Sequence, residues 1–166
     1  MTTSLLGDAF AHHIWATESL LDECAALSPD QLRTPCPGTF GSISETLRHL
    51  VSTDSWYLTF FREWPVPADD WVEGSFGELR SLITANGVAW MELLAGDLDA
   101  ETDIVEHGDG WDFHSPLGFR LAQVIQHGTD HRSQVCTALT GLGLTPPELD
   151  LWRFGEVTGR TRGEHL

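Results

Sequence analysis

The segment His127-Gly-Thr-Asp-His131 places two histidines four residues apart inside an apolar stretch of the chain. In a helix, residues at this spacing lie about 40° apart on one face, one turn above each other. Two neutral imidazoles so placed can bind the same divalent cation, at about 2.0–2.1 Å if it is zinc. The spacing therefore indicates a metal site, and two ligands from one helix call for a third.

His49 is the best candidate for that third ligand. It follows Leu47 and precedes Leu50 and Val51, in a segment with the apolar spacing of a helix. Three histidines from two helices would leave coordination positions open, as catalytic zinc sites do. Imidazole also suits nickel, iron and copper, so the pattern does not identify the metal. A core histidine satisfied by hydrogen bonds, or one on a helix surface, would explain each ring taken singly.

Other histidines and one acidic residue are weaker candidates. His13 lies on the apolar stripe of the first helical segment, so we expect it in the core or a pocket wall. A fourth metal ligand and a proton-transfer group are its alternatives, and His13 and Glu45 are the only candidates for a general base. His12 is expected to be solvated. Cys36 is expected to be an ordinary thiol, with a reactive one as the alternative.

Two residues are candidates for substrate contact. Arg132 follows His131 directly and could bind a carboxylate, although a surface salt bridge is the commoner outcome for such a residue. Trp56 shares a helix face with His49, and that face could line a pocket; packing is the alternative for this tryptophan. His107 and His114 lie in a connection whose structure the sequence does not predict.

Apolar residues spaced three and four apart predict four long helices. The expected ranges are 4–27, 42–64, 75–96 and 115 to 141 or 143. Ser42-x-x-Glu45 and Ser75-x-x-Glu78 are capping boxes that open the second and third of these. Val88 and Met91 are among the residues expected on the buried face of the third.

The remaining segments are shorter. Residues 99–114 form either a long loop or a short hairpin around Gly108-Asp109-Gly110, because an Asp-Gly pair is a turn signal. Residues 148–156 can add a short helix. Four long amphipathic helices without a confident strand predict an all-α four-helix bundle. It has a long connection before the last long helix and forms a single domain over residues 1–166.

The composition limits the classes of molecule that the chain is expected to bind. The chain has 25 acidic residues against 9 basic ones, all arginine, and a net charge of -16, which repels nucleic acid and anionic membranes. Cys24, Cys36 and Cys136 form no C-x-x-C motif, so neither a disulfide framework nor a cysteine zinc site is expected. No signal peptide and no apolar run of about 18 residues is apparent. We expect a cytoplasmic protein that acts on a small molecule.

Two segments resemble the motifs of the DinB/YfiT-like family of metalloenzymes. They are Leu47-Arg48-His49-Leu50 and His127-Gly-Thr-Asp-His131-Arg132-Ser133-Gln134. The family motif ends in His-Arg-Gly-Gln, and this chain has Ser133 at the glycine position. The resemblance extends to Trp15-Ala16 and to Gly141-Leu142-Gly143, so it spans nearly the whole chain.

The resemblance implies a four-helix bundle, often a homodimer, with a divalent metal on His49, His127 and His131. Zinc is the first expectation, with nickel or iron as alternatives. Relatives include enzymes that use low-molecular-weight thiols, such as mycothiol-dependent isomerases and bacillithiol transferases. The leading hypothesis is an enzyme that activates a mycothiol-like thiol for transfer, isomerisation or detoxification of a small electrophile. A hydrolase using metal-bound water and a non-catalytic dimeric binding bundle are the alternatives.

Overall fold

The computed structural model describes residues 5–39, 41–66 and 75–163 and is mostly helical, as predicted. Within these ranges it contains six helices and one two-stranded antiparallel sheet. The helices are α1 (Gly7–Cys24), α2 (Pro29–Leu32), α3 (Ile43–Leu58), α4 (Phe76–Leu94), α5 (Leu117–Gly141) and α6 (Leu151–Thr158). The strands are β1 (Asp103–Gly108) and β2 (Trp111–Pro116), so the connection before α5 is the hairpin and not the long loop.

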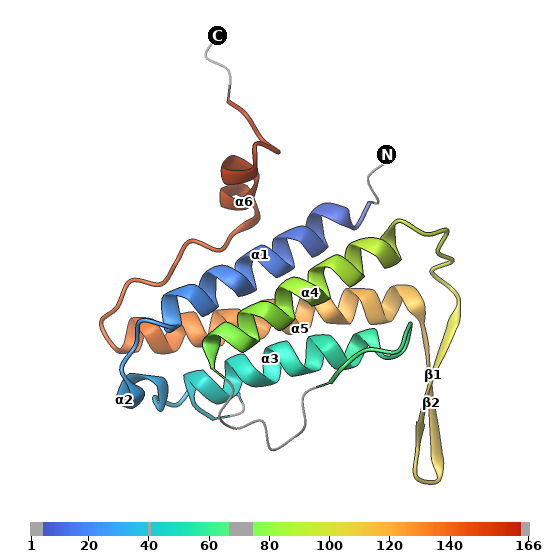
Figure 1. Cartoon of the computed structure of the whole chain (residues 1–166), viewed down its shortest axis with the longest axis horizontal. Helices are drawn as coiled ribbons and strands as arrows, with labels where there is room; N and C mark the ends of the chain where they lie inside the picture. Colours follow the sequence, from blue (N-terminus) through green and yellow to red (C-terminus); the bar gives the residue numbers. More distant parts are fainter. Residues whose placement is uncertain (1–4, 40, 67–74, 164–166) are drawn as a thin grey trace.

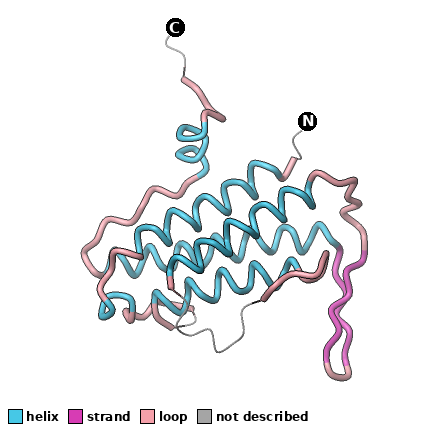
Figure 2. Tube along the Cα trace, viewed as in Figure 1, coloured by secondary structure: helices cyan, strands magenta, loops and turns pink. Residues whose placement is uncertain are grey.

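The four long helices lie side by side (Figure 1). Helix α1 packs against α4 and α5, and α3 packs against the same two helices. The hairpin projects from the end of the molecule where α5 begins, and α6 lies outside the long helices against α1 (Figure 2). The two segments that carry the predicted metal ligands, α3 and α5, are therefore neighbours. No helix in the described part of the chain is long and apolar enough to cross a membrane.

Hydrogen-bonded caps explain where the helices begin. The hydroxyls of Ser42 and Ser75 accept bonds from the backbone three residues later and open α3 and α4, as predicted. A third capping box joins Ser28 and Gln31 and opens the short helix α2. Helix α2 has no counterpart among the predicted elements, because Ser28-Pro29 directly follows the expected first helix and a proline there ends a helix as readily as it opens one.

The core consists of two apolar clusters separated by polar side chains. One cluster includes Leu20, Leu47 and Val135, and the other includes Phe10, Trp90 and Leu121. Between them each long helix contributes buried polar groups, which we call the polar layer. The polar layer consists of His13, Thr17, Asp54, Ser55, Asn86 and Arg132.

One prediction about the core is wrong. Val88 and Met91 of α4 are 58% and 41% exposed, although their apolar spacing predicts a place on the buried face. The buried positions of α4 follow the stripe that contains Ile83, Asn86 and Trp90, and Val88 and Met91 lie beside that stripe. They line an open groove of about 570 Å³ between α4 and α1. An apolar surface is thus left uncovered along these two helices.

Candidate metal centre

Three histidine rings converge between α3 and α5. The Nε2 atom of His127 lies 3.1 Å from Nε2 of His49 and 3.1 Å from Nε2 of His131. One ligand nitrogen from each ring lies within 4.8 Å of the other two. Two nitrogens about 2.0–2.1 Å from one zinc ion, at angles between octahedral and tetrahedral, would be roughly 2.9–3.4 Å apart. The observed spacing therefore fits a single shared cation.

Local structure explains this convergence. His127 and His131 are four residues apart on α5, which places both rings on one face of the helix. His49 reaches them from α3, which packs directly against α5. His131 is buried, and His49 and His127 are half-buried at the edge of the core. The spacing of the pair is a local property of the helix, whereas the approach of His49 depends on the packing of two distant segments.

Hydrogen bonds on the outer side of the rings determine which nitrogens face inward. Gln134 donates its amide N–H to the Gly38 carbonyl at 3.1 Å, so its Oε1 faces His131 Nδ1 at 2.7 Å. This oxygen accepts the Nδ1 hydrogen, which leaves the lone pair of a neutral His131 ring on Nε2. The hydroxyls of Thr39 and Thr53 lie 3.1 Å and 3.3 Å from Nδ1 of His131 and His49. Such outer partners orient metal-binding histidines.

Burial keeps these rings in the form that can bind a metal. Desolvation, followed by the neighbouring His131 and His49, lowers the pKa of His127 to about 4. Desolvation and then His131 also lower the pKa of His49. Both rings are therefore neutral at neutral pH, as metal ligation requires. A cation is the group that would satisfy several lone pairs pointing at one another, so the donor set fits a metal ion.

The comparison with known proteins agrees with the motif resemblance. A sequence model of the DinB family matches residues 1–164. The chain belongs to the DinB family. No curated protein matches it. The departure from the DinB motif at Ser133 falls on an exposed position of α5, where a side chain is accommodated without displacing the three rings.

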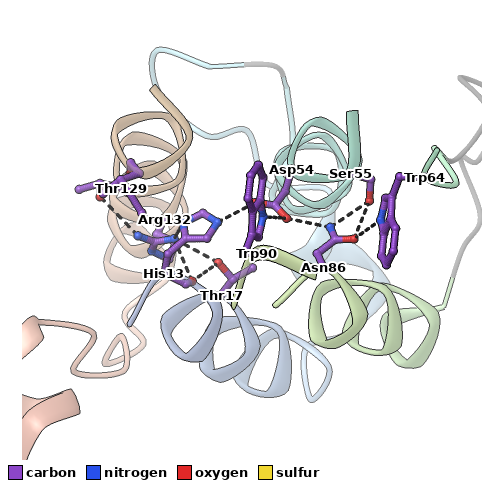
Figure 3. Close-up of polar contacts among 10 residues, drawn as sticks. His13, Thr17, Asp54, Ser55, Trp64, Asn86, Trp90, Thr129 and Arg132 are labelled. Atoms are coloured by element: carbon purple, nitrogen blue, oxygen red, sulfur yellow. Dashed lines mark hydrogen bonds and ion pairs between the residues drawn. The ribbon is translucent and has the colours of Figure 1, made fainter. Parts of the chain in front are cut away.

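In this DinB chain, His13 lies in the polar layer (Figure 3) and is not part of the three-histidine cluster. It is 1% exposed, and its Nε2 lies 2.9 Å from Asp54 Oδ1. On its other side, Arg132 Nη1 donates to His13 Nδ1 at 3.1 Å and to Thr17 Oγ1 at 3.1 Å. Because Nδ1 accepts from a guanidinium, Nε2 carries the hydrogen and donates it to the carboxylate. A neutral imidazole therefore connects a buried cation to a buried anion.

Arg132 is consequently a residue of the interior. It is 4% exposed, and burial lowers its pKa to about 10, with Asp54 opposing the shift, so it is charged at neutral pH. Its contacts with α1 also account for Gly128. A Cβ atom at Gly128 would lie 2.3 Å from His13 Cε1 and 2.8 Å from Arg132 Nη1. The glycine between the two histidines of the motif leaves room for this contact.

Within the polar layer, Asp54 joins α3 to α4. Asn86 Nδ2 donates to Asp54 Oδ2 at 2.8 Å, and Trp90 Nε1 donates to the same carboxylate at 3.1 Å. Asn86 Oδ1 accepts from Trp64 Nε1 at 2.8 Å and from the Ser55 hydroxyl at 3.2 Å (Figure 3). Asp54 is not among the candidate residues predicted from the sequence. Its signal is a carboxylate on the same stripe as the apolar residues of α3, at a position three and four residues from buried neighbours.

The other sequence candidates lie in separate places. Glu45 is exposed at the start of α3, and its carboxylate accepts bonds from the backbone N–H and the hydroxyl of Ser42. These bonds lower its pKa, so it is a weak base. Trp56 is half-buried and lines a cavity beside α5. The structure thus brings His49, His127 and His131 together, and places Glu45, His13 and Arg132 outside that cluster.

Two further predictions concern His12 and Cys36. The expectation that His12 is solvated is wrong, because it is half-buried and its Nε2 lies 2.7 Å from the Leu149 carbonyl. The segment leading to α6 folds back over α1 and covers this ring. Cys36 is buried, and burial raises its pKa, which disfavours the thiolate that a reactive cysteine needs.

The hairpin histidines form exposed cross-strand contacts. His107 Nδ1 lies 2.7 Å from Asp112, and His114 Nδ1 lies 2.7 Å from Asp103. The hydrogen bond with Asp103 raises the pKa of His114. Both rings lie outside the three-histidine cluster, and exposed pairs of this kind contribute little to stability.

Proposed function

We propose that the chain is a metal-dependent enzyme that activates a low-molecular-weight thiol for reaction with a small electrophile. The observation that carries the proposal is the convergence of three histidine Nε2 atoms from α3 and α5. We assign His49, His127 and His131 as ligands of one divalent cation, with zinc as the first expectation and nickel or iron as alternatives. Three protein ligands leave at least one position for a cosubstrate.

The residues of the chain position this chemistry. Gln134 and two threonines, Thr39 and Thr53, hold the outer nitrogens of the rings and thereby aim the inner ones at one point. A bound cation would lower the pKa of a coordinating thiol and supply a nucleophile at neutral pH. In a transfer reaction the sulfur would form a bond to the electrophilic carbon, and the displaced group would leave with its bonding electron pair.

The cysteines of the chain favour a thiol supplied from outside. Burial raises the pKa of Cys24 to about 12, and it raises the pKa of Cys36 and Cys136 as well. All three are therefore poor sources of thiolate. Hydrolysis, the alternative reaction, calls for a general base. Glu45 is held by Ser42, and His13 is held within the polar layer, so neither of the bases named from the sequence faces the three rings.

We propose further that the chain is a single-domain, cytoplasmic four-helix bundle that forms a homodimer. The groove between α1 and α4, with exposed Val88 and Met91, offers an apolar surface for a second copy. A charge of -16 disfavours nucleic acid and anionic membranes as partners. The partner of the metal centre would then be a small molecule.

The proposal is tested by a thiol-transfer assay. Metal-loaded protein is mixed with chlorodinitrobenzene and, in turn, mycothiol, bacillithiol or glutathione, and chloride release is followed. With at least one thiol, the wild type should release chloride faster than His49→Ala. The control His114→Ala, which removes an exposed hairpin histidine, should also be faster than His49→Ala. Equal rates for all three proteins with every thiol would refute thiol activation. Ester hydrolysis without thiol, lost in His49→Ala, would favour the hydrolase.

A further inference from the structure

A cavity of about 230 Å³ lies between α3, the hairpin and the start of α5. Half of the residues that line it are aromatic, namely Trp56, Tyr57, Phe113 and Phe119, and Arg120 provides its cationic group. The hairpin register pairs Glu106 with Phe113, and Ser115 is two residues further along the same strand. Side chains two apart share a face of a strand, so one face of the hairpin meets Arg120.

Arg120 is buried without a full set of partners. It is 5% exposed, and its Nε donates to Ser115 Oγ at 2.7 Å. Its Cζ lies 4.0 Å from the centre of the Phe60 ring. The distance from Nη1 to Glu106 Oε2 is 3.6 Å, longer than a hydrogen bond, and Nη2 is buried with no hydrogen-bond partner. Leaving a buried cation incompletely bonded is costly, and such a group calls for a functional explanation.

The position of Arg120 relates it to the histidines. Arg120 and His127 are seven residues apart on α5, so they lie on the same helix face, about 10 Å apart along the axis. Tyr57 lines the cavity together with Arg120, and its ring centre lies 6.1 Å from that of His127. Gln123, one turn before His127, also lines the cavity. A small molecule held in the cavity would therefore extend toward the three rings.

We propose that Arg120 binds the carboxylate of a small molecule whose other end reaches the three histidines. This assignment rests on the proposed function for the role of the histidine end. The planar guanidinium suits a carboxylate, and the aromatic wall suits an apolar or unsaturated body between the two ends. Glu106 limits the site to a weakly charged anion, because a more highly charged group would be repelled by its carboxylate.

The assignment differs from the one suggested by the motif. Arg132 is next to His131 in the sequence, but its guanidinium donates to groups of α1 inside the core. Arg120 is seven residues before His127 and outside the motif, yet it lines the cavity. The carboxylate belongs either to the thiol or to the electrophile, and the chemistry at Arg120 is the same for both.

Calorimetric titration of metal-free protein tests the site without any activity measurement. Phenylpropionate should bind at least about tenfold more tightly than its neutral amide, since a hydrogen bond to a charged group contributes roughly this factor or more. Arg120→Gln should remove that preference, and Arg153→Gln, which changes an exposed arginine, should keep it. Equal affinities for the acid and the amide in the wild type, or a preference that survives in Arg120→Gln, would overturn the proposal.

A second variant covers the case in which Arg120→Gln fails to fold. Glu106→Gln removes the carboxylate that competes for the guanidinium, so phenylpropionate should bind several-fold more tightly while the amide is unaffected. Unchanged or weaker binding of the acid would contradict the assignment. A preference for the acid in metal-free protein, found together with failure to bind metal, would leave the Arg120 site intact and defeat the proposed function.

Metal-loaded protein identifies the source of the carboxylate. If mercaptohexanoate excludes phenylpropionate, whereas mercaptohexanamide does not, the carboxylate belongs to the thiol. If both thiols bind together with phenylpropionate, and the protein still prefers phenylpropionate to its amide, the carboxylate belongs to the second substrate. Both results support an anion site at Arg120. Loss of the preference for acid on metal loading would count against a site that operates beside the metal.

Discussion

Replacing Gly128 with alanine should destabilise the protein, although alanine favours helices over glycine. The new methyl carbon would lie 2.3 Å from His13 Cε1 and 2.5 Å from His13 Nδ1, closer than any real contact. Because Asp54 accepts a hydrogen bond from the far side of His13, the ring cannot retreat without breaking a buried hydrogen bond to a carboxylate. The helix gain and the steric cost thus act in opposite directions.

The magnitudes decide the sign of the effect. Alanine in place of a helical glycine stabilises by about 1 kcal/mol. Forcing a carbon into a packed site costs about 1–3 kcal/mol, and losing one hydrogen bond to a charged group, such as that between Arg132 and His13, costs about 1.5–3 kcal/mol. The free energy of unfolding should therefore fall by about 1.5–5 kcal/mol. For a chain of this size the melting temperature should fall by at least about 3 °C.

Gly141 provides the matched control on the same helix. It ends α5, and a Cβ atom there meets nothing within 4 Å, so Gly141→Ala should be neutral or slightly stabilising. Urea unfolding followed by circular dichroism, with thermal melts of the same samples, measures both variants. Equal stabilities for Gly128→Ala and Gly141→Ala would refute the argument that the motif glycine makes room for the polar layer.

Three further predictions concern Asp54, His127 and Val88. Asp54→Asn should lower the free energy of unfolding by about 3–5 kcal/mol, because it leaves the buried Arg132 cation without its balancing carboxylate. Asp130→Asn, on the exposed face of α5, should change this free energy little, and urea unfolding measures both variants. In metal-free protein the pKa of His127 is about 4 against 6.5 in the unfolded chain, so the unfolded state binds the proton first on acidification. The free energy of unfolding should thus fall as the pH drops from 6.5 to about 4, and it should fall more in the wild type than in His127→Gln. The same pH dependence in both proteins would contradict the low pKa of His127. Val88→Asp should convert a dimer to a monomer in light scattering, whereas Val157→Asp on α6 should not; a monomeric wild type would contradict the dimer.

Local patterns in the sequence were sufficient for much of this structure. The helices follow from apolar spacing and the capping boxes, since both depend on residues within a few positions of each other. The pair His127 and His131 is equally local, because four residues make about one helical turn. The hairpin cannot be told from a loop by its sequence pattern, because its strands alternate poorly between apolar and polar residues.

Contacts between distant segments were not predictable in this way. Asp54 and His13 are 41 residues apart, and Arg132 and His13 are 119 apart, so no window of sequence contains the polar layer. His12 was predicted to be solvated from its helix face alone, but Leu149, 137 residues later, covers it. The approach of His49 to the pair was expected from a family resemblance and from its helix face, not from spacing.

Metal stoichiometry decides whether the three histidine rings form a metal centre. Purified protein is titrated with zinc and analysed for bound metal, in the wild type and in the single variants His49→Ala, His127→Ala, His131→Ala and His114→Ala. One equivalent per chain should bind to the wild type and to His114→Ala, and each of the other three variants should bind far more weakly. Tight binding that survives the loss of His49, or no binding to the wild type, would contradict a metal centre made by these three rings.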